Sequence, residues 1–136
     1  MRDMAQEQKE LLLKDLCARL PYNVKCTYYD KCIDEQSEGT ITGMQNGTYF
    51  VIDGVCIDVE NVKPYLLPLS SMTEEQCYEL ASIRSGFQDC WKYIKTPIPL
   101  AICNFEQIDW FHRNHFDYRG LIENGLATDA TNLNIY

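Results

Sequence analysis

The first part of the chain carries apolar residues at helical spacing within an otherwise polar stretch. The apolar positions are Leu12, Leu13, Leu16, Cys17 and Leu20. Residues three and four apart share one face of an α-helix, so this pattern predicts an amphipathic helix over residues 4–20. Pro21 disfavours the helical conformation at the residue before it, and we expect the helix to end there.

From residue 23 to residue 69 the apolar period shortens to two, which is typical of half-buried strands. Strands are predicted over 24–28, 39–45, 48–53 and 55–59, with a polar loop over 31–37. Asn46-Gly47 and Asp53-Gly54 separate the later strands, and both dipeptides favour hairpin turns because they adopt positive φ easily. The pattern predicts an antiparallel β-meander, of a size that suits a small SH3-like barrel or a curled sheet.

The segment 62–69 is apolar but contains Pro64 and Pro68. A proline has no amide proton for a sheet and restricts the residue before it. We therefore expect an extended connector rather than a central strand. Its side chains should pack on the core through Tyr65, Leu67 and Leu69.

Residues 73–127 read as a helical section. Thr73 and Gln76 form a capping box, which predicts a helix to about residue 84. Helical spacing resumes over 87–95, and Asn104 with Gln107 predicts another helix start, with the end near Asn114. Asp117 can cap a last short helix that Gly125 would end.

The remaining residues, 128–136, are polar, and we expect a loose tail. Together the segments predict one α+β domain over residues 1–136: an N-terminal helix, a small antiparallel meander and a C-terminal helical section. A chain of 136 residues is of ordinary single-domain length and can bury a core without cross-links.

Net charge narrows the choice of partners. The formal net charge is −8, and residues 31–62 hold six acids against Lys31 alone. An acidic surface repels nucleic-acid backbones and anionic membranes, which argues against both as partners. The charge can serve solubility only, or it can form a face that meets a basic partner.

The seven cysteines are widely spaced, without a C-x-x-C pair, so they predict neither a zinc knuckle nor a redox motif. The N-terminus has no apolar signal-peptide core, and no apolar run reaches the roughly 18 residues of a membrane span. Reduced thiols in a cytoplasm are the expectation that follows.

Candidate chemistry concentrates in residues 109–119, which contain both histidines. His112, His115 and Asp117 could hold a metal, but H-x-x-H is a weak pattern, and histidines near a helix end are favoured by the helix dipole. The letters H-R-N-H lack the preceding hairpin of a ββα-metal nuclease. Cys103 could pair with a histidine as a nucleophile, yet it lies in an apolar run, which favours core packing.

The same segment is rich in the residue types that dominate protein interfaces. The predicted interaction residues are Trp110, His112, His115, Tyr118 and Arg119. Phe111, Phe116 and Leu121 are expected to close the core instead. No catalytic residue, metal ligand or cofactor is assigned.

Two stretches carry a resemblance: residues 63–73 and residues 115–127. They resemble segments of uncharacterised small phage and prophage proteins of gut bacteria, as does the opening helix followed by Leu20-Pro21-Tyr22. That family has no established activity, so it supplies no catalytic residues. The resemblance implies a bacterial host cytoplasm during infection or lysogeny.

The favoured function is therefore a non-enzymatic accessory or inhibitor protein that binds a host protein. The alternative is a small-molecule or nucleotide binder, with a basic pocket at Arg113, Arg119 or Lys63 in a homo-oligomer. A metal-dependent hydrolase or nuclease has weaker support, and a nucleic-acid module on the meander conflicts with its acidity.

Overall fold

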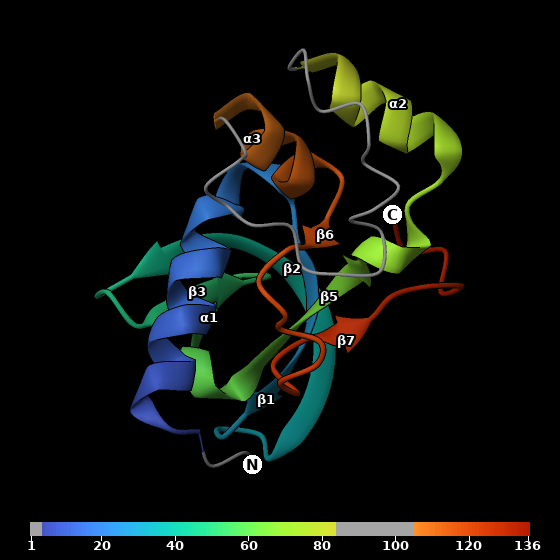
Figure 1. Cartoon of the computed structure of the whole chain (residues 1–136). Coiled ribbons are helices and arrows are strands. Elements are labelled where there is room, and N and C mark those ends of the chain that lie inside the picture. The colour runs from blue at the N-terminus through green and yellow to red at the C-terminus, as the bar shows by residue number, and fades with distance from the viewer. Residues whose placement is uncertain (1–3, 84–104) are drawn as a thin grey trace.

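The computed structural model describes residues 4–83 and 105–136 (Figure 1), and the helix expected over 87–95 and Cys103 lie outside these ranges. Three α-helices and a mixed sheet of seven strands make up the described part, so the fold is α+β as predicted. None of these three helices is long and apolar enough to cross a membrane.

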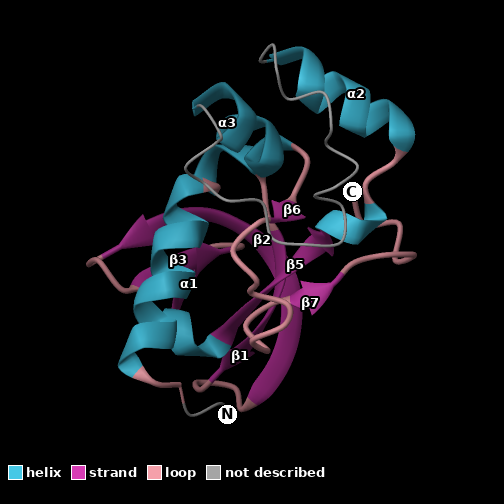
Figure 2. Cartoon of the chain, viewed as in Figure 1, coloured by secondary structure: helices cyan, strands magenta, loops and turns pink. Residues whose placement is uncertain are grey.

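Helix α1 (Gln6–Ala18) packs its apolar stripe on the sheet (Figure 2). Leu12 and Leu16 are completely or almost completely buried in the core that the helix shares with the strands. The helix ends earlier than predicted, because Leu20–Tyr22 form a separate 3-10 turn with Pro21 at its start. Proline is tolerated in a first turn, where its missing amide has no helical partner.

Strand β1 (Lys25–Asp30) pairs antiparallel with the long strand β2 (Glu35–Gln45). Val24, Cys26 and Tyr28 are buried, as their alternation predicted. The polar loop predicted over 31–37 is shorter, because residues 35–37 belong to β2 and pair with residues 28–30. Polar side chains there point to solvent from regular strand backbone, which a hydrophobic pattern does not reveal.

Strands β3 (Tyr49–Ile52) and β4 (Val55–Asp58) complete the meander. Asp53 and Gly54 form the predicted two-residue turn, with φ of 50° and 84°. Asn46 and Gly47 also have positive φ, but Gln45 pairs with Tyr49, so this loop contains three residues.

The fourth predicted strand is shortened at its end. Strand β4 ends at Asp58, and Val59 is the first residue of a 3-10 turn over Val59–Asn61. The Val59 side chain is buried as expected. Val55, by contrast, is exposed at the edge of the sheet.

The segment expected to be a connector is strand β5 (Val62–Pro68), and that prediction was wrong. The sheet order is β4-β3-β2-β1-β5-β6, and β7 also pairs with β5. Tyr65 and Leu69 are buried as expected, and Leu66 is fully buried as well.

The two prolines are tolerated because of where their missing amides fall. The Ile41 amide bonds the Val24 carbonyl, so even-numbered residues of β1 bond β2. Pro64 lies opposite Cys26, whose backbone amide and carbonyl point to β2. No hydrogen bond from a Pro64 amide to β1 is therefore missing. Strand β7 pairs with β5 only at Tyr65 and Leu66, so neither proline interrupts that ladder.

The C-terminal residues are docked on the sheet rather than loose, which corrects the expectation for 128–136. Strands β6 (Phe116–Asp117) and β7 (Thr128–Asp129) run parallel to β5. Ala130 is buried, and the Tyr136 hydroxyl donates to the Tyr65 carbonyl at 2.8 Å.

Helices α2 (Glu74–Ile83) and α3 (Phe105–Arg113) pack beside a second apolar cluster at one end of the sheet (Figure 1). The Thr73–Gln76 capping box forms as predicted, with reciprocal bonds of 2.9 and 3.2 Å. Asp117 caps the amides of Leu121 and Ile122, but the chain there forms turns instead of a helix.

The curled sheet is not a closed barrel. Strand β4 ends the strand order and pairs only with β3 among the described strands. It nevertheless approaches β1, the strand three places away in the order. This open seam between β1 and β4 is where the candidate site lies.

Candidate binding cleft

Of the five predicted interaction residues, three are interior. Trp110, His112 and Tyr118 retain 1%, 7% and 3% of their surface, so they form no exposed patch on this chain. Trp110 stacks on Phe116 with ring centroids 5.6 Å apart, and its indole donates to Glu79 at 2.8 Å.

Arg119 belongs to a buried ion network with α1. Asp15 and Arg19 lie one helical turn apart and are both fully buried, and the Arg19 guanidinium donates to both Asp15 oxygens, at 2.8 and 3.2 Å. Arg119 donates to Asp15 Oδ1 at 3.0 Å from the other end of the chain. Two cations around one carboxylate fix α1 against the segment 116–119.

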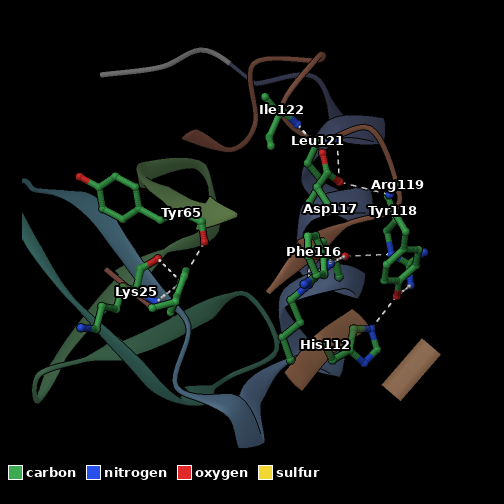
Figure 3. Close-up of polar contacts among 12 residues, drawn as sticks. Lys25, Tyr65, His112, Phe116, Asp117, Tyr118, Arg119, Leu121 and Ile122 are labelled. Atoms are coloured by element: carbon green, nitrogen blue, oxygen red, sulfur yellow. Dashed lines mark hydrogen bonds and ion pairs between the residues drawn. The ribbon is translucent and has the colours of Figure 1, made fainter. Parts of the chain in front are cut away.

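Tyr118 connects this network to His112 (Figure 3). Arg119 can only donate, so the Tyr118 hydroxyl accepts from it at 3.1 Å and gives its own proton to His112 Nε2 at 2.6 Å. Burial, assisted by the Arg19 charge, lowers the pKa of His112 to about 4. His112 is therefore a neutral acceptor at neutral pH, with its proton on Nδ1.

His115 and Asp117 have structural partners of their own. The His115 ring stacks on Tyr136 with centroids 3.6 Å apart, and burial lowers its pKa to about 4. Asp117 accepts bonds from the amides of Arg119, Leu121 and Ile122. Within residues 4–83 and 105–136 no group of three or more His, Cys, Asp or Glu side chains is placed to hold a metal.

A cleft of about 220 Å³ opens on the seam between β1 and β4. Its lining residues are Tyr29, Asp30, Lys31, Cys32, Tyr49, Cys56, Ile57, Asp58 and Asn61. One wall is the end of β1 with the turn after it, the opposite wall is β4, and the 3-10 turn after β4 supplies Asn61. None of these lining residues is among the interaction residues predicted from the sequence.

Acidic groups lie on both walls of the cleft, Asp30 on the β1 side and Asp58 on β4. Asp30 accepts the Cys32 amide at 2.9 Å and Asp58 accepts the Glu60 amide at 3.2 Å, so backbone bonds fix both carboxylates. Lys31 is the one basic residue in the lining. The cleft therefore favours a cationic group in this part of the chain.

Asn61, in the wall of the cleft, has a buried hydrogen-bond acceptor without a donor. It is only 9% exposed, and its Oδ1 has no donor in the structure. It also lines a smaller neighbouring cleft of about 130 Å³. A buried acceptor without a donor costs free energy, and because Oδ1 is shielded from solvent, a ligand in the cleft does not reach it in this structure.

Apolar and thiol groups surround the acids. Tyr49 in the lining is 40% exposed, and Ile33, next in the chain to Cys32, is 57% exposed. Both Cys32 and Cys56 are exposed, and the Cys56 thiol donates to Gln45 Oε1 at 2.9 Å. A mixed rim of this kind suits a peptide better than a bare ion.

The sequence carried one signal for this cleft, the acid-rich stretch 31–62 that contains Asp58. Asp30 and Asp58 are 28 positions apart, and only the curl of the sheet brings them to one opening.

A second cavity, of about 410 Å³, lies between β1, β2 and the C-terminal residues. Its lining includes Lys25, Glu38, Tyr65 and Ile135. Lys25 Nζ donates to the Ile135 carbonyl at 3.1 Å, and Tyr65 donates to Glu38 at 2.9 Å, so the charged groups there are already engaged.

Comparisons with protein-family models, with curated proteins and with solved structures find no match for this chain. By its fold, the chain is an α+β protein with an open, curled sheet and an acidic cleft on the β1–β4 seam.

Proposed function

We propose that this is a non-enzymatic accessory or inhibitor protein that acts by binding a basic segment of another protein. The resemblance to phage and prophage proteins makes a bacterial host protein the favoured partner. The acidic meander, with six acids against one lysine over residues 31–62, supports a basic partner.

The observation that carries the proposal is the cleft on the β1–β4 seam. Two carboxylates in its lining, each fixed by a backbone amide, favour a cationic group. At about 220 Å³ the cleft is smaller than the roughly 300 Å³ at which small-molecule pockets begin. One long side chain of a protein partner fits this size better than a free ligand.

The histidines support a non-enzymatic function in a second way. His112 is bonded to Tyr118 and His115 is stacked on Tyr136, so both rings already serve the packing of the C-terminal part. Neither of them lines the acidic cleft.

The test is affinity capture from host lysate with matched variants. Asp30→Asn and Asp58→Asn remove charge but keep an acceptor for the backbone amide that each carboxylate caps. We expect the double variant to lose a stoichiometric partner that the wild type and the double control Glu106→Gln/Glu123→Gln retain. Glu106 and Glu123 are exposed and outside the cleft, so the control removes the same two charges elsewhere. Capture of the partner in equal amounts by all three proteins would contradict the proposal.

The second candidate is a small-molecule binder that uses the cavity of about 410 Å³, which lies within the usual range for such sites. The basic residues predicted for that function are not part of it: Arg113 pairs with Asp109 at 3.5 Å, and Arg119 is held by Asp15. A thermal-shift assay with a panel of nucleotides tests this alternative. A rise in Tm that Lys25→Ala abolishes would favour it.

A further inference from the structure

The cavity of about 410 Å³ between β1, β2 and the C-terminal residues is lined by one positive and one negative side chain. We propose that it binds a small zwitterion of the size of a free α-amino acid, with the ligand's carboxylate at Lys25 and its ammonium at Glu38. This site is separate from the acidic cleft, so the inference goes beyond the proposed function and does not depend on it.

The strand register places both charged side chains on one face of the sheet. Lys25 pairs with Thr40, and Thr27 pairs with Glu38. Alternate residues of a strand share a face, and paired residues do as well, so Lys25, Glu38 and Thr40 lie on the same face. Cys26 points to the other face, where it is buried in the core with α1. The cavity therefore lies on the face turned away from α1.

The C-terminal residues complete the cavity. Asn134 and Ile135 line it together with Tyr65 of β5. The side chains of Lys25 and Tyr65 point to the same side of the sheet (Figure 3). Asn134 and Thr40 add uncharged hydrogen-bonding groups, and Ile135 adds apolar surface. The volume lies within the roughly 300–1,000 Å³ that is usual for small-molecule sites.

Both charges keep free bonding capacity. Lys25 Nζ carries three protons and gives one to the Ile135 carbonyl at 3.1 Å. Glu38 accepts the Tyr65 hydroxyl at Oε1 at 2.9 Å, which leaves Oε2 for a ligand. These partners are neutral, and neither charged side chain forms an ion pair with another described residue.

The spacing of the two charges suits a short ligand with two charged ends. Lys25 and Glu38 are diagonal neighbours in the β1–β2 ladder, and such neighbours lie roughly 7–8 Å apart. A direct ion pair is closer than this, so the separation leaves room for the ammonium and the carboxylate of one α-amino acid. Each end of the ligand then meets a group of opposite charge.

Other ligand classes satisfy only one of the two charges. A nucleotide would bring phosphates beside the Glu38 carboxylate, and a simple cation would be repelled by Lys25. A zwitterion carries no net charge, so the acidic surface of the chain does not repel it. Lys25 and Glu38 both reach solvent, which limits each ion pair to the strength of a surface pair and predicts an affinity of about 1 mM.

The probe is L-leucine, titrated into the whole chain labelled with nitrogen-15. We expect saturable shifts at the amides of Gly39 and Thr40, which line the cavity, and none at Cys56 in the acidic cleft. Leucinamide lacks the carboxylate and N-acetyl-leucine lacks the ammonium, so each should bind about threefold to fivefold more weakly. Binding of either analogue as tightly as leucine would overturn the inference, as would the absence of saturable shifts with leucine.

A protein variant assigns the ammonium end. Glu38→Gln removes the charge but keeps an acceptor for the Tyr65 hydroxyl, so the fold should be retained. It should weaken leucine binding about threefold to fivefold and leave the binding of N-acetyl-leucine unchanged. Glu35→Gln is the matched control, because Glu35 is exposed on the same strand and lies outside the cavity.

The control should bind leucine as the wild type does. Equal weakening by Glu35→Gln and Glu38→Gln would show that net charge, and not the position of Glu38, is responsible, which contradicts the site. A nucleotide that shifts the Gly39 and Thr40 amides at lower concentration than leucine would also contradict it, and would favour the nucleotide alternative.

Discussion

Buried ionisable side chains join the two ends of the fold. Arg19 is completely buried, donates to Asp15 and reaches the Phe116 carbonyl at 2.7 Å, while its Nη1 atom lacks a partner. Tyr118 lies against both guanidinium groups, with its ring centroid 5.3 Å from Arg19 Cζ and 5.0 Å from Arg119 Cζ. These contacts compensate in part for the desolvation of two cations.

Stability should depend on pH through His112. Its pKa falls from an ordinary 6.5 to about 4 in the folded chain, so the unfolded chain binds more protons between these values. The free energy of unfolding is then full above pH 6.5 and decreases as pH drops toward 4, by roughly 3 kcal/mol from this group.

Urea unfolding at pH values from 4.5 to 7.5 measures this decrease. His112→Gln keeps an acceptor for Tyr118 and cannot titrate, so its stability should depend less on pH than that of the wild type. Identical pH profiles for the two proteins would show that His112 is not the group responsible.

At the scale of elements, the hydrophobic period predicted α1 and the strand alternation of β1, and the residue types of Thr73 and Gln76 predicted the capping box of α2. It failed at β5, where two prolines concealed a strand, because a sequence does not show which side of a strand lacks partners. It also failed for Trp110 and Tyr118. Their residue types suit interfaces, but both rings are buried with partners for their polar tips. The Trp110 indole reaches the exposed Glu79, and the Tyr118 hydroxyl accepts from Arg119.

Strand β2 contains two glycines with different surroundings, and they provide a matched test. A Cβ at Gly39 would lie 2.4 Å from Asp53 Oδ2 and 2.7 Å from Ile52 Cγ2, whereas one at Gly43 would meet nothing closer than 4.0 Å. Gly39→Ala should lower the free energy of unfolding by about 1–3 kcal/mol. Gly43→Ala should stay within about 0.5 kcal/mol of the wild type in the same denaturation assay. Equal effects would show that β2 has no close approach at Gly39.

At the scale of the whole molecule, the C-terminal residues are part of the fold. The Tyr136 hydroxyl accepts the Lys25 amide at 2.8 Å and donates to the Tyr65 carbonyl at 2.8 Å, so it connects β1 and β5 at the point where their pairing ends. Burial raises the pKa of Tyr136 to about 12, which keeps this proton in place across the physiological range.

Tyr136→Phe keeps the ring on His115 and removes both hydrogen bonds. We expect a loss of about 1–2 kcal/mol in unfolding free energy, together with faster hydrogen exchange at the Lys25 amide. Tyr78→Phe is the control, since Tyr78 is 59% exposed and its bond to Glu74 is 3.4 Å long. An unchanged exchange rate at Lys25 would contradict the docking of residue 136.

The contact between Asp15 and Arg119 also has a consequence for synthesis on the ribosome. The two residues are 104 positions apart, which a ribosome adding about 5–20 residues per second covers in roughly 5–20 seconds. During that interval the nascent α1 holds Asp15 and Arg19 without Arg119 or the Phe116 carbonyl. Leu12 and Leu16 then lack the Leu121 and Leu126 side chains of their final core. Helix α1 therefore gains its strand contacts early in synthesis, and it is completed only when the segment with Arg119, Leu121 and Leu126 has been added.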